Sequence, residues 1–405
     1  MTRLCFVGPS WITRRGNEYR CFPWFLKLNE TFIGFFPEVV LLGPEAEGSV
    51  GPSQGPALSD WATIELHNVR VRGLPMRGGR MRRSVSQLPG LWRNLHDADL
   101  VCIDMPNEIA VLAFLVCKFK KKPFFVRLLG DWGESTLFGG SLNIGRRLKA
   151  TMGEWLTRLV VRFSPLVFVQ GRSLYDKYRR YNPSAVVDGL LHSTLTEGIY
   201  HEKHSASFHD PIRILTVSSL IQLKGLDVLL QALRLMMAEG LHVEWWCVGQ
   251  GSLRNSLEDL ARTLGVHDCV RFWGHVPFGS RLLGFYRDAD IFVLPSHTEG
   301  VSIALLEAMA QSLLVVATSG GGTPGVIHDR INGLLVPRAR PDLLAQAIAN
   351  LASDKELCIR MRQAALRSAR QYDSRMLAER MMHVLEQKFG EIHKGWTTDL
   401  PTKSP

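Results

Sequence analysis

The sequence predicts an α/β chain of two doubly wound domains, each with a parallel sheet covered by helices on both faces. Three observations predict this class. Short apolar runs alternate with longer amphipathic segments along the 405 residues. The strand-like runs are predominantly apolar and β-rich, as in sheets that are buried on both faces. The alternation occurs in two successive blocks, and the chain exceeds the usual size of one domain.

The first block alternates strands with helices. Its apolar, β-rich runs predict strands at Leu4–Val7, Val39–Leu42, Leu100–Ile103, Phe124–Leu128 and Leu166–Val169. Its amphipathic segments predict helices at Ile109–Phe119, Leu142–Arg162 and Ser173–Arg180.

The second block shows the same alternation more clearly. Strands are expected at Ile212–Val217, Val243–Val248, Val270–Trp273, Ile291–Leu294 and Leu314–Ala317. Helices are expected at Gly225–Glu239, Ser252–Leu264, Arg281–Arg287, Ile303–Gln311 and Pro341–Ala352.

The domain boundary is expected between His192 and Asp210, a stretch rich in Ser and His that lacks apolar periodicity and precedes Pro211. We therefore divide the chain into residues 1–200, 201–372 and a closing segment 373–405. The linker histidines are interpreted as solvated rather than as metal ligands.

Composition limits the class of partner. The net charge of +10 favours anionic partners such as phosphates, nucleic acid or an acidic membrane surface.

The seven cysteines are scattered without a CxxC pair, which predicts buried thiols in a reducing compartment rather than disulfides or zinc. The start Met1–Thr2–Arg3 runs directly into a strand and does not resemble a signal peptide, and the longest apolar run, Ile109–Cys117, is too short to span a bilayer. We expect a cytoplasmic protein, either free or peripheral on the inner face of a membrane.

A basic, glycine-rich segment runs from Arg70 to Arg83. It is expected to form a flexible loop. Two interpretations stay open, a solvated surface loop and a contact with an anionic membrane or a phosphate-bearing acceptor.

The segment from Asp290 to Gly333 is the most informative. A strand is followed by Glu299–Gly300 and then by a helix that carries Glu307. A helix N-terminus after a parallel strand binds anionic phosphates, and a glycine there permits close backbone approach. Carboxylates repel phosphates but accept hydrogen bonds from sugar and ribose hydroxyls. Glu307 lies in an apolar run and therefore needs a polar partner.

Three further loops follow predicted strands of the second domain. One carries Lys224–Gly225 at a helix start, where an uncompensated cation calls for an anion such as a diphosphate. The others carry Gly249–Gln250–Gly251 and the glycine-rich run 319–324. All four loops converge on the carboxyl edge of one sheet, where ligands of open α/β folds bind.

At these residues the sequence resembles glycosyltransferase family 4, a family of retaining enzymes with the GT-B fold. Residues 210 to 372 look like its donor domain, in which two glutamates eight positions apart (Glu299 and Glu307 here) are a signature. The remaining matches are Gly321–Gly322–Thr323–Pro324, Asn332–Gly333–Leu334–Leu335–Val336 and Lys224–Gly225. The resemblance implies two Rossmann-like domains facing a central cleft, the first binding acceptor and the second nucleotide-sugar. The first half matches only loosely, and the last helix, Tyr372–Phe389, resembles one that crosses back to the first domain.

The resemblance implies roles for individual residues. Glu299 would hold the hydroxyls of the donor sugar and Glu307 the ribose, while Lys224 would neutralise the diphosphate. Further donor contacts are expected at Gly300, Val301, Ser302, Ser219, Gly249, Gly251, His275 and Val276. Acceptor contacts are expected at Gly8 and Gly16. No metal or cofactor is implied, because the cationic side chain and the helix dipole take that place, and the leaving phosphate is pictured as taking the acceptor's proton.

Three departures from the family pattern matter. Ser218–Ser219 stands where the family has Gly–Arg. The arginine that helps to bind the diphosphate is therefore missing, and the sequence does not show which other basic residue takes its place. Gly325 replaces a frequent glutamate. Asp131, in Leu129–Gly130–Asp131–Trp132, occupies the place of a frequent histidine and is either a catalytic group or a cap of the following turn.

The resemblance therefore implies a retaining hexosyltransferase-like enzyme, and we expect it to act in polysaccharide biosynthesis. It would use a nucleotide-diphosphate sugar and a glycan or lipid-linked acceptor. The alternative is a degenerate relative that binds nucleotide or a partner without turnover. A Rossmann dehydrogenase is disfavoured because no GxGxxG follows the first strand, and nucleic-acid binding because no aromatic platform accompanies the basic residues. The sugar, the base, the acceptor and the oligomeric state are not determined.

Overall fold

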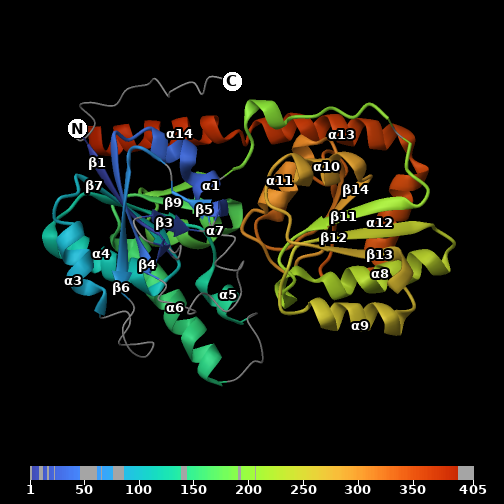
Figure 1. Ribbon diagram of the computed structural model, residues 1–405, viewed down its shortest axis with the longest axis horizontal. Helices are drawn as coiled ribbons and strands as arrows, with labels where there is room; N and C mark the ends of the chain where they lie inside the picture. Colours follow the sequence, from blue (N-terminus) through green and yellow to red (C-terminus); the bar gives the residue numbers. More distant parts are fainter. Residues whose placement is uncertain are drawn as a thin grey trace. The chain divides into compact units, whose positions relative to one another are not determined.

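A computed structural model gives the structure of the protein (Figure 1). It describes residues 2–8, 12–15, 18–21, 23–45, 62–64, 66–75, 86–137, 144–189, 193–205 and 207–390. These residues form two compact units. Unit 1 holds the described residues up to 189 and those from 374 to 390, and unit 2 holds residues 193–373. The segment 193–200, expected in the first domain, belongs to unit 2 because Ile199 and His201 hydrogen bond to its residues Gln311 and Ala310.

Unit 1 is built on a parallel sheet with the strand order β6–β4–β1–β7–β8–β9–β10. These strands are β1 (Arg3–Val7), β4 (Glu38–Glu45), β6 (Val69–Pro75), β7 (Leu100–Met105), β8 (Phe124–Leu128), β9 (Val167–Gln170) and β10 (Val186–Gly189). Short strands β2 (Ile12–Arg15), β3 (Glu18–Cys21) and β5 (Ala62–Thr63) extend the sheet beside β4. Strands β7, β8 and β9 are buried at every position, as in a sheet covered on both faces, and the charged Asp104 and Arg127 among them pair with each other.

Helices cover both faces of this sheet. Residues of α1 (Pro23–Gly34) and α14 (Ser374–Phe389) pack in one apolar cluster with alternate residues of β1, β7 and β8. The opposite face packs against a second helix group. This group comprises α3 (Leu88–Asn94), α4 (Glu108–Lys120), α6 (Ile144–Phe163) and α7 (Arg172–Tyr178). A short helix, α5 (Trp132–Leu137), packs against α6, where the Trp132 ring covers Gly153.

Unit 2 has a parallel sheet with the order β13–β12–β11–β14–β15–β16. Its strands are β11 (Ile212–Val217), β12 (Val243–Val248), β13 (Val270–Gly274), β14 (Ile291–Leu294), β15 (Leu314–Thr318) and β16 (Leu334–Val336). Its helices are α8 (Leu226–Ala238), α9 (Arg254–Leu264), α10 (Ser280–Asp288), α11 (Ile303–Ala310), α12 (Pro341–Ser353) and α13 (Lys355–Arg370).

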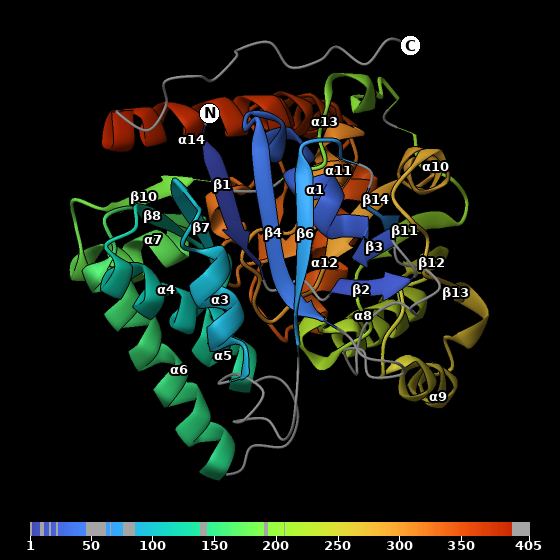
Figure 2. The same cartoon turned by 60° about the vertical axis from the view of Figure 1, so that its left-hand side comes forward.

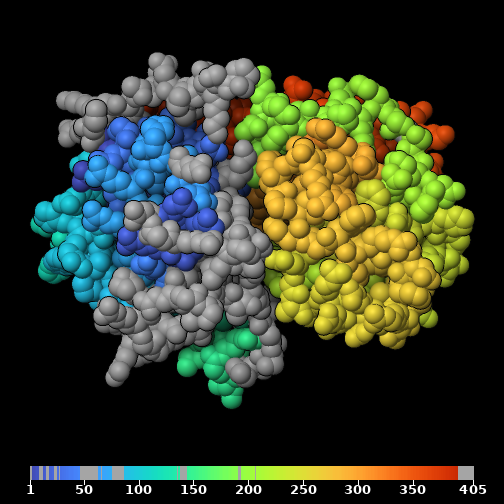
Figure 3. All heavy atoms as spheres, viewed as in Figure 1, coloured from blue at the N-terminus to red at the C-terminus, as the bar shows by residue number. Residues whose placement is uncertain are grey.

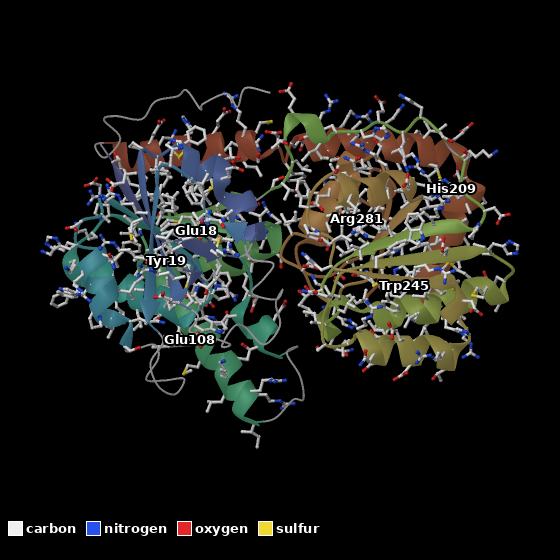
Figure 4. The ribbon with its side chains drawn as sticks, in the orientation of Figure 1. Glu18, Tyr19, Glu108, His209, Trp245 and Arg281 are labelled. Atoms are coloured by element: carbon white, nitrogen blue, oxygen red, sulfur yellow. The ribbon has the colours of Figure 1, made fainter. Side chains whose placement is uncertain are left out.

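These helices also cover two faces. One face of the sheet packs with α8, α9 and α12, and Trp245 of β12, labelled in Figure 4, is fully buried there. Its indole Nε1 donates to Thr216 Oγ1 at 3.1 Å, so the buried N–H is satisfied. Helix α10 lies against the other face, with the Tyr286 ring 6.0 Å from that of Phe292. Both units are therefore doubly wound and Rossmann-like, which confirms the predicted α/β class.

Several elements differ from the sequence prediction. The prediction of a basic loop from Arg70 is wrong for the first part of that segment, because residues 69–75 form β6. There Val-Arg-Val-Arg alternates, and the valines pack toward the core while Arg70 pairs with Glu38 and Arg72 donates to Asn94 Oδ1. Residues 76–83 of that segment lie outside the described residues. The helices α1 and α13 and the strands β10 and β16 were not expected from sequence.

No helix in the part of the chain that the structure describes combines the length and apolar character needed to cross a bilayer.

Candidate functional site

The strand order of unit 2 creates a switch point between β11 and β14. From β11 the chain moves outward through β12 and β13, and then returns to place β14 on the other side of β11. The loops that leave the carboxyl ends of β11 and β14 therefore diverge. Ligands of open α/β sheets bind in the crevice at such a point. Unit 1 has an equivalent switch point between β1 and β7.

Lys224 and Glu299 meet at this switch point. Lys224 ends the 3-10 turn Gln222–Lys224 after β11, and Glu299 lies in the loop after β14. The Lys224 ammonium donates to Glu299 Oε1, and the side chains are only 17% and 12% exposed. Ser296 Oγ donates to the same carboxylate oxygen at 3.1 Å. The described residues place no hydrogen-bond donor on Glu299 Oε2.

This ion pair corrects one premise of the sequence analysis. Lys224 was expected to lack a compensating anion at the start of a helix. Instead Glu299 is its counterion, and α8 begins only at Leu226, after Gly225 has adopted a left-handed conformation with φ +59°. A substituent at Gly225 would lie 2.2 Å from the Pro295 carbonyl oxygen, so only glycine allows the two loops to approach this closely.

The glycine-rich loop after β15 supports the Glu299 loop from the other side. Gly322 N donates to the Glu299 carbonyl at 2.7 Å. A Cβ at Gly321 would lie 2.0 Å from that carbonyl oxygen, and one at Gly322 would lie 1.6 Å from the Gly300 carbonyl oxygen. These glycines are therefore required for backbone packing, whether or not they also contact phosphate.

The glycines in the loop after β12 are also required for close packing of the backbone. A Cβ at Gly249, whose φ is +141°, would lie 1.8 Å from the Ser218 carbonyl oxygen, and one at Gly251 would lie 2.4 Å from that of Leu220. The loops after β11 and β12 are thus packed backbone against backbone. Ser219 is exposed, whereas Ser218 Oγ is buried and has no hydrogen-bond partner among the described residues. From the sequence, Ser218 is named only as part of the Ser218–Ser219 departure, and its unpaired hydroxyl makes it a further candidate for a ligand contact.

Helix α11 begins directly beyond Glu299. Ser302 is its N-cap, and its Oγ accepts a hydrogen bond from Leu305 N at 3.4 Å. Val301 is buried and Gly300 packs against the glycine-rich loop. The first turn therefore directs its unpaired backbone N–H groups toward the carboxyl edge of the sheet, where they favour an anion.

Glu307 has its polar contacts elsewhere. It lies in α11, is 4% exposed, and accepts hydrogen bonds from Thr194 Oγ1 at 2.8 Å and from the Tyr286 hydroxyl at 2.7 Å. Burial raises its carboxyl pKa to about 7, although the two hydroxyl donors act in the opposite direction. Both carboxylate oxygens are occupied by protein hydroxyls. The structure therefore brings Lys224 and Glu299 together, while Glu307 fastens the segment after residue 193 to α10 and α11.

A basic residue that the sequence analysis could not name lies beside the Glu299 loop. Arg338 follows β16, and its Nη1 donates to the His297 carbonyl at 2.9 Å. His297 N in turn donates to the Leu223 carbonyl at 2.9 Å, which ties the loops after β11 and β14 together. Arg338 is exposed and stands at the same carboxyl edge as Lys224. No sequence motif marks it, because its proximity depends on the position of β16 in the sheet.

The remaining predicted donor residues lie in the loop after β13. His275 is exposed and Val276 is 5% exposed. The Gly274 carbonyl accepts a hydrogen bond from Gly249 N at 2.8 Å, so this loop is joined to the one after β12. Both residues therefore stand at the predicted edge, and their contact with a base stays a prediction.

In unit 1, Asp131 is a paired residue. Its Oδ1 accepts from Glu134 N at 2.9 Å, which caps α5, and its Oδ2 pairs with Lys177. Lys177 also contacts Glu154 Oε2 at 2.8 Å, and its pKa is raised by these carboxylates against the effect of burial. Asp131 therefore caps the turn that follows it, which is one of the two roles expected from the sequence. Gly8 follows β1 and packs against Phe6 and Phe25, and Gly16 lies outside the described residues.

Comparisons with known proteins show what the chain is similar to. The family described as Glycosyl transferases group 1 matches residues 200–368. The amylovoran biosynthesis glycosyltransferase AmsK of Erwinia amylovora is 31% identical over 201 residues, which cover 46% of this chain and 49% of that protein. The putative colanic acid biosynthesis glycosyltransferase WcaL of Escherichia coli is 33% identical over 145 residues, 34% of this chain and 36% of that protein. The chain thus spans about half, or less, of the length of these relatives.

A solved structure extends the likeness in fold to nearly the whole chain. Anabaena Alr3699/HepE in complex with UDP and glucose superposes with a TM-score of 0.73 at 15% identity, covering 96% of this chain and all of that one. The two-domain GT-B fold class predicted from sequence is confirmed. Residues 200–368, which match the family described as Glycosyl transferases group 1, carry Lys224, Glu299 and Glu307.

Proposed function

We propose that this protein transfers a sugar from a nucleotide-diphosphate sugar to a glycan or lipid-linked acceptor, with retention of anomeric configuration, as a member of glycosyltransferase family 4. The observation that carries the proposal is the Lys224–Glu299 pair at the β11/β14 switch point. A cation for the diphosphate and a carboxylate for sugar hydroxyls are held there side by side.

The donor would lie along the carboxyl edge of the unit 2 sheet. Lys224 has one N–H engaged by Glu299 and two left to donate to the diphosphate. The N-terminus of α11, at Ser302, adds backbone N–H groups and its dipole. Glu299 Oε2 would accept a hydroxyl of the sugar. Arg338 would supply the second cation that is missing because residue 219 is a serine and not an arginine. To do so it would exchange its hydrogen bond to the His297 carbonyl for one to phosphate.

In the proposed reaction the bond between the anomeric carbon and the phosphate oxygen breaks. The acceptor oxygen bonds to that carbon on the same face, and the leaving phosphate takes the acceptor's proton. Negative charge therefore grows on the diphosphate in the transition state, where Lys224 and the α11 N-terminus stabilise it. These cationic groups are proposed to do so without a metal. We assign Asp131 a positioning role, since it caps α5 and holds Lys177.

The curated relatives and the solved structures each suggest which substrates to test first. The named activities of AmsK and WcaL lie in amylovoran and colanic acid biosynthesis, and HepE was solved with UDP and UDP-glucose. A UDP-sugar and an exopolysaccharide or lipid-linked acceptor are therefore the first donor and acceptor to test.

The experiment combines a thermal-shift panel of nucleotide sugars with calorimetry and a transfer assay. In Lys224→Met, loss of a charge-assisted hydrogen bond of about 1.5–3 kcal/mol should weaken nucleoside diphosphate binding roughly 10- to 150-fold. Nucleoside binding should change far less. Glu299→Gln should retain nucleoside diphosphate binding and lose transfer.

Arg262→Met is a matched control, since it removes an exposed cation from the same unit. Equal losses for nucleoside and nucleoside diphosphate in Lys224→Met would reject the phosphate assignment. Tight binding of a nucleotide sugar without transfer or hydrolysis of any donor would instead support the non-catalytic alternative, which Ser219 motivates.

A further inference from the structure

Helix α6 of unit 1 presents an apolar stripe to solvent. We use the name α6 stripe for Ile144, Leu148, Met152 and Trp155. These side chains are 87%, 70%, 55% and 59% exposed. Large apolar side chains this exposed are common singly, but four on one helix form a contiguous patch that marks an interaction surface.

The spacing places the stripe on one side of the helix. At about 100° per residue, its four members fall within an arc of roughly 80°. The buried residues of α6 include Ala150, Gly153, Thr157 and Val160, and they fall on the opposite side. The helix therefore has two apolar faces. One packs against the unit 1 sheet, and the other has no cover from any described residue.

Basic side chains border the stripe. Arg147 lies along one border of the stripe and Lys149 along the other. The one acidic residue of α6 is Glu154, which is turned inward to accept from Lys177 Nζ and the Tyr178 hydroxyl, each at 2.8 Å. An apolar stripe flanked by arginine and lysine, with a tryptophan at its C-terminal end, is the pattern of a helix that lies in a membrane interface.

The stripe stands at the carboxyl end of the unit 1 sheet. Helix α6 follows β8, and its C-terminal end returns the chain to the start of β9. Its N-terminal half, which carries three of the four stripe residues, therefore projects past the edge where the loops after β1 and β8 emerge. Figures 1 and 2 show α6 extending beyond the strands of unit 1, and the space-filling view shows its green N-terminal part at the lower end of that unit (Figure 3).

We infer that the α6 stripe docks unit 1 on an anionic phospholipid surface. The aliphatic side chains would enter the boundary between headgroups and acyl chains, and Arg147 and Lys149 would contact lipid phosphates. A second copy of this chain fits less well, because two α6 stripes face to face would oppose their flanking cations. The docking is separate from the basic segment after β6, whose residues 76–83 lie outside the described residues.

Docking would bring the carboxyl edge of unit 1 against the membrane. If unit 1 binds the acceptor, which rests on the proposed function, the sugar-accepting hydroxyl would be presented by a lipid carrier embedded in the same surface. The docking itself needs no donor, acceptor or turnover. It can therefore fail or succeed independently of the transferase assignment.

The test is cosedimentation of the full chain with vesicles of phosphatidylcholine alone and with phosphatidylglycerol added. The wild type should bind the anionic vesicles, bind phosphatidylcholine at least about tenfold more weakly, and lose affinity as salt is raised. Leu148→Glu/Met152→Glu should lower the apparent partition coefficient on anionic vesicles at least about tenfold. Arg147→Gln/Lys149→Gln should lower it less and flatten its salt dependence.

Leu115→Glu/Phe119→Glu is the matched control. These residues also lie four apart on a helix of unit 1 and are 51% and 77% exposed, but they sit near the C-terminal end of α4. The control should bind within about twofold of wild type. All variants should keep the wild-type unfolding midpoint, because the changed side chains are exposed. Failure of the wild type to bind anionic vesicles would overturn the inference. So would a larger loss in the α4 control, or a wild-type dimer that the α6 variant dissociates.

Discussion

Replacing Glu307 by glutamine should remove a specific part of the pH dependence of stability. Glu307 is buried, and its two carboxylate oxygens accept from Thr194 and Tyr286. Glutamine keeps the shape of the side chain and one carbonyl acceptor, and its amide donates to the other hydroxyl oxygen. The substitution therefore deletes the titration while leaving the packing in place.

The magnitude follows from the raised pKa. The pKa of the Glu307 carboxyl is about 7 in the folded protein, against 4.5 for the free group. Between these values the folded state holds more protons than the unfolded state, so stability falls as the pH rises from 4.5 and levels off above 7. At about 1.4 kcal/mol per pH unit, the full loss is roughly 3 kcal/mol.

Urea unfolding of wild type and Glu307→Gln, followed by tryptophan fluorescence from pH 5 to 8, measures this loss. The free energy of unfolding of the wild type minus that of the variant should fall by about 2–3 kcal/mol across the range. Tyr286→Phe is the comparison variant. It keeps the carboxyl but removes a donor that lowers its pKa, so the decline should extend to higher pH. A difference that stays constant with pH would show that Glu307 does not titrate in this range and would refute the reasoning.

Three further predictions follow from the contacts of other residues. Arg338→Met should weaken nucleoside diphosphate binding by roughly tenfold in calorimetry and leave the unfolding midpoint unchanged; an unaltered affinity would remove Arg338 as the second cation. Arg127→Leu should cost about 3–5 kcal/mol in urea unfolding, because it leaves the carboxylate of Asp104, bonded at 2.6 and 2.7 Å, buried without its partner. Asp104→Leu/Arg127→Leu should recover most of that loss, and a double variant as unstable as the single one would contradict this. Gly322→Ala should cost about 1–3 kcal/mol and lower donor affinity by displacing the loop at Gly300; wild-type affinity in a thermal-shift titration would exclude that displacement.

The sequence by itself determined the class of the fold and singled out Lys224 and Glu299, which the structure brings together. Continuous apolar runs such as Ile291–Leu294 are typical of strands buried on both faces, so parallel sheets followed from the pattern. Glu299 and Lys224 could be singled out because each follows a strand of the same domain, and loops after parallel strands share one edge. Strand β6 was missed where its valine–arginine alternation was interpreted as a basic loop.

Only the tertiary structure decided which side chains touch. Lys224 and Glu299 are 75 residues apart and pair because β14 returns to lie beside β11, an order that local pattern does not encode. Thr194 and Tyr286 reach Glu307 from two other segments, and lone hydroxyl residues leave no motif. Arg338 owes its place to β16 at the end of the sheet. Periodicity records whether a residue faces the core, while its partners depend on how distant strands and helices are brought together.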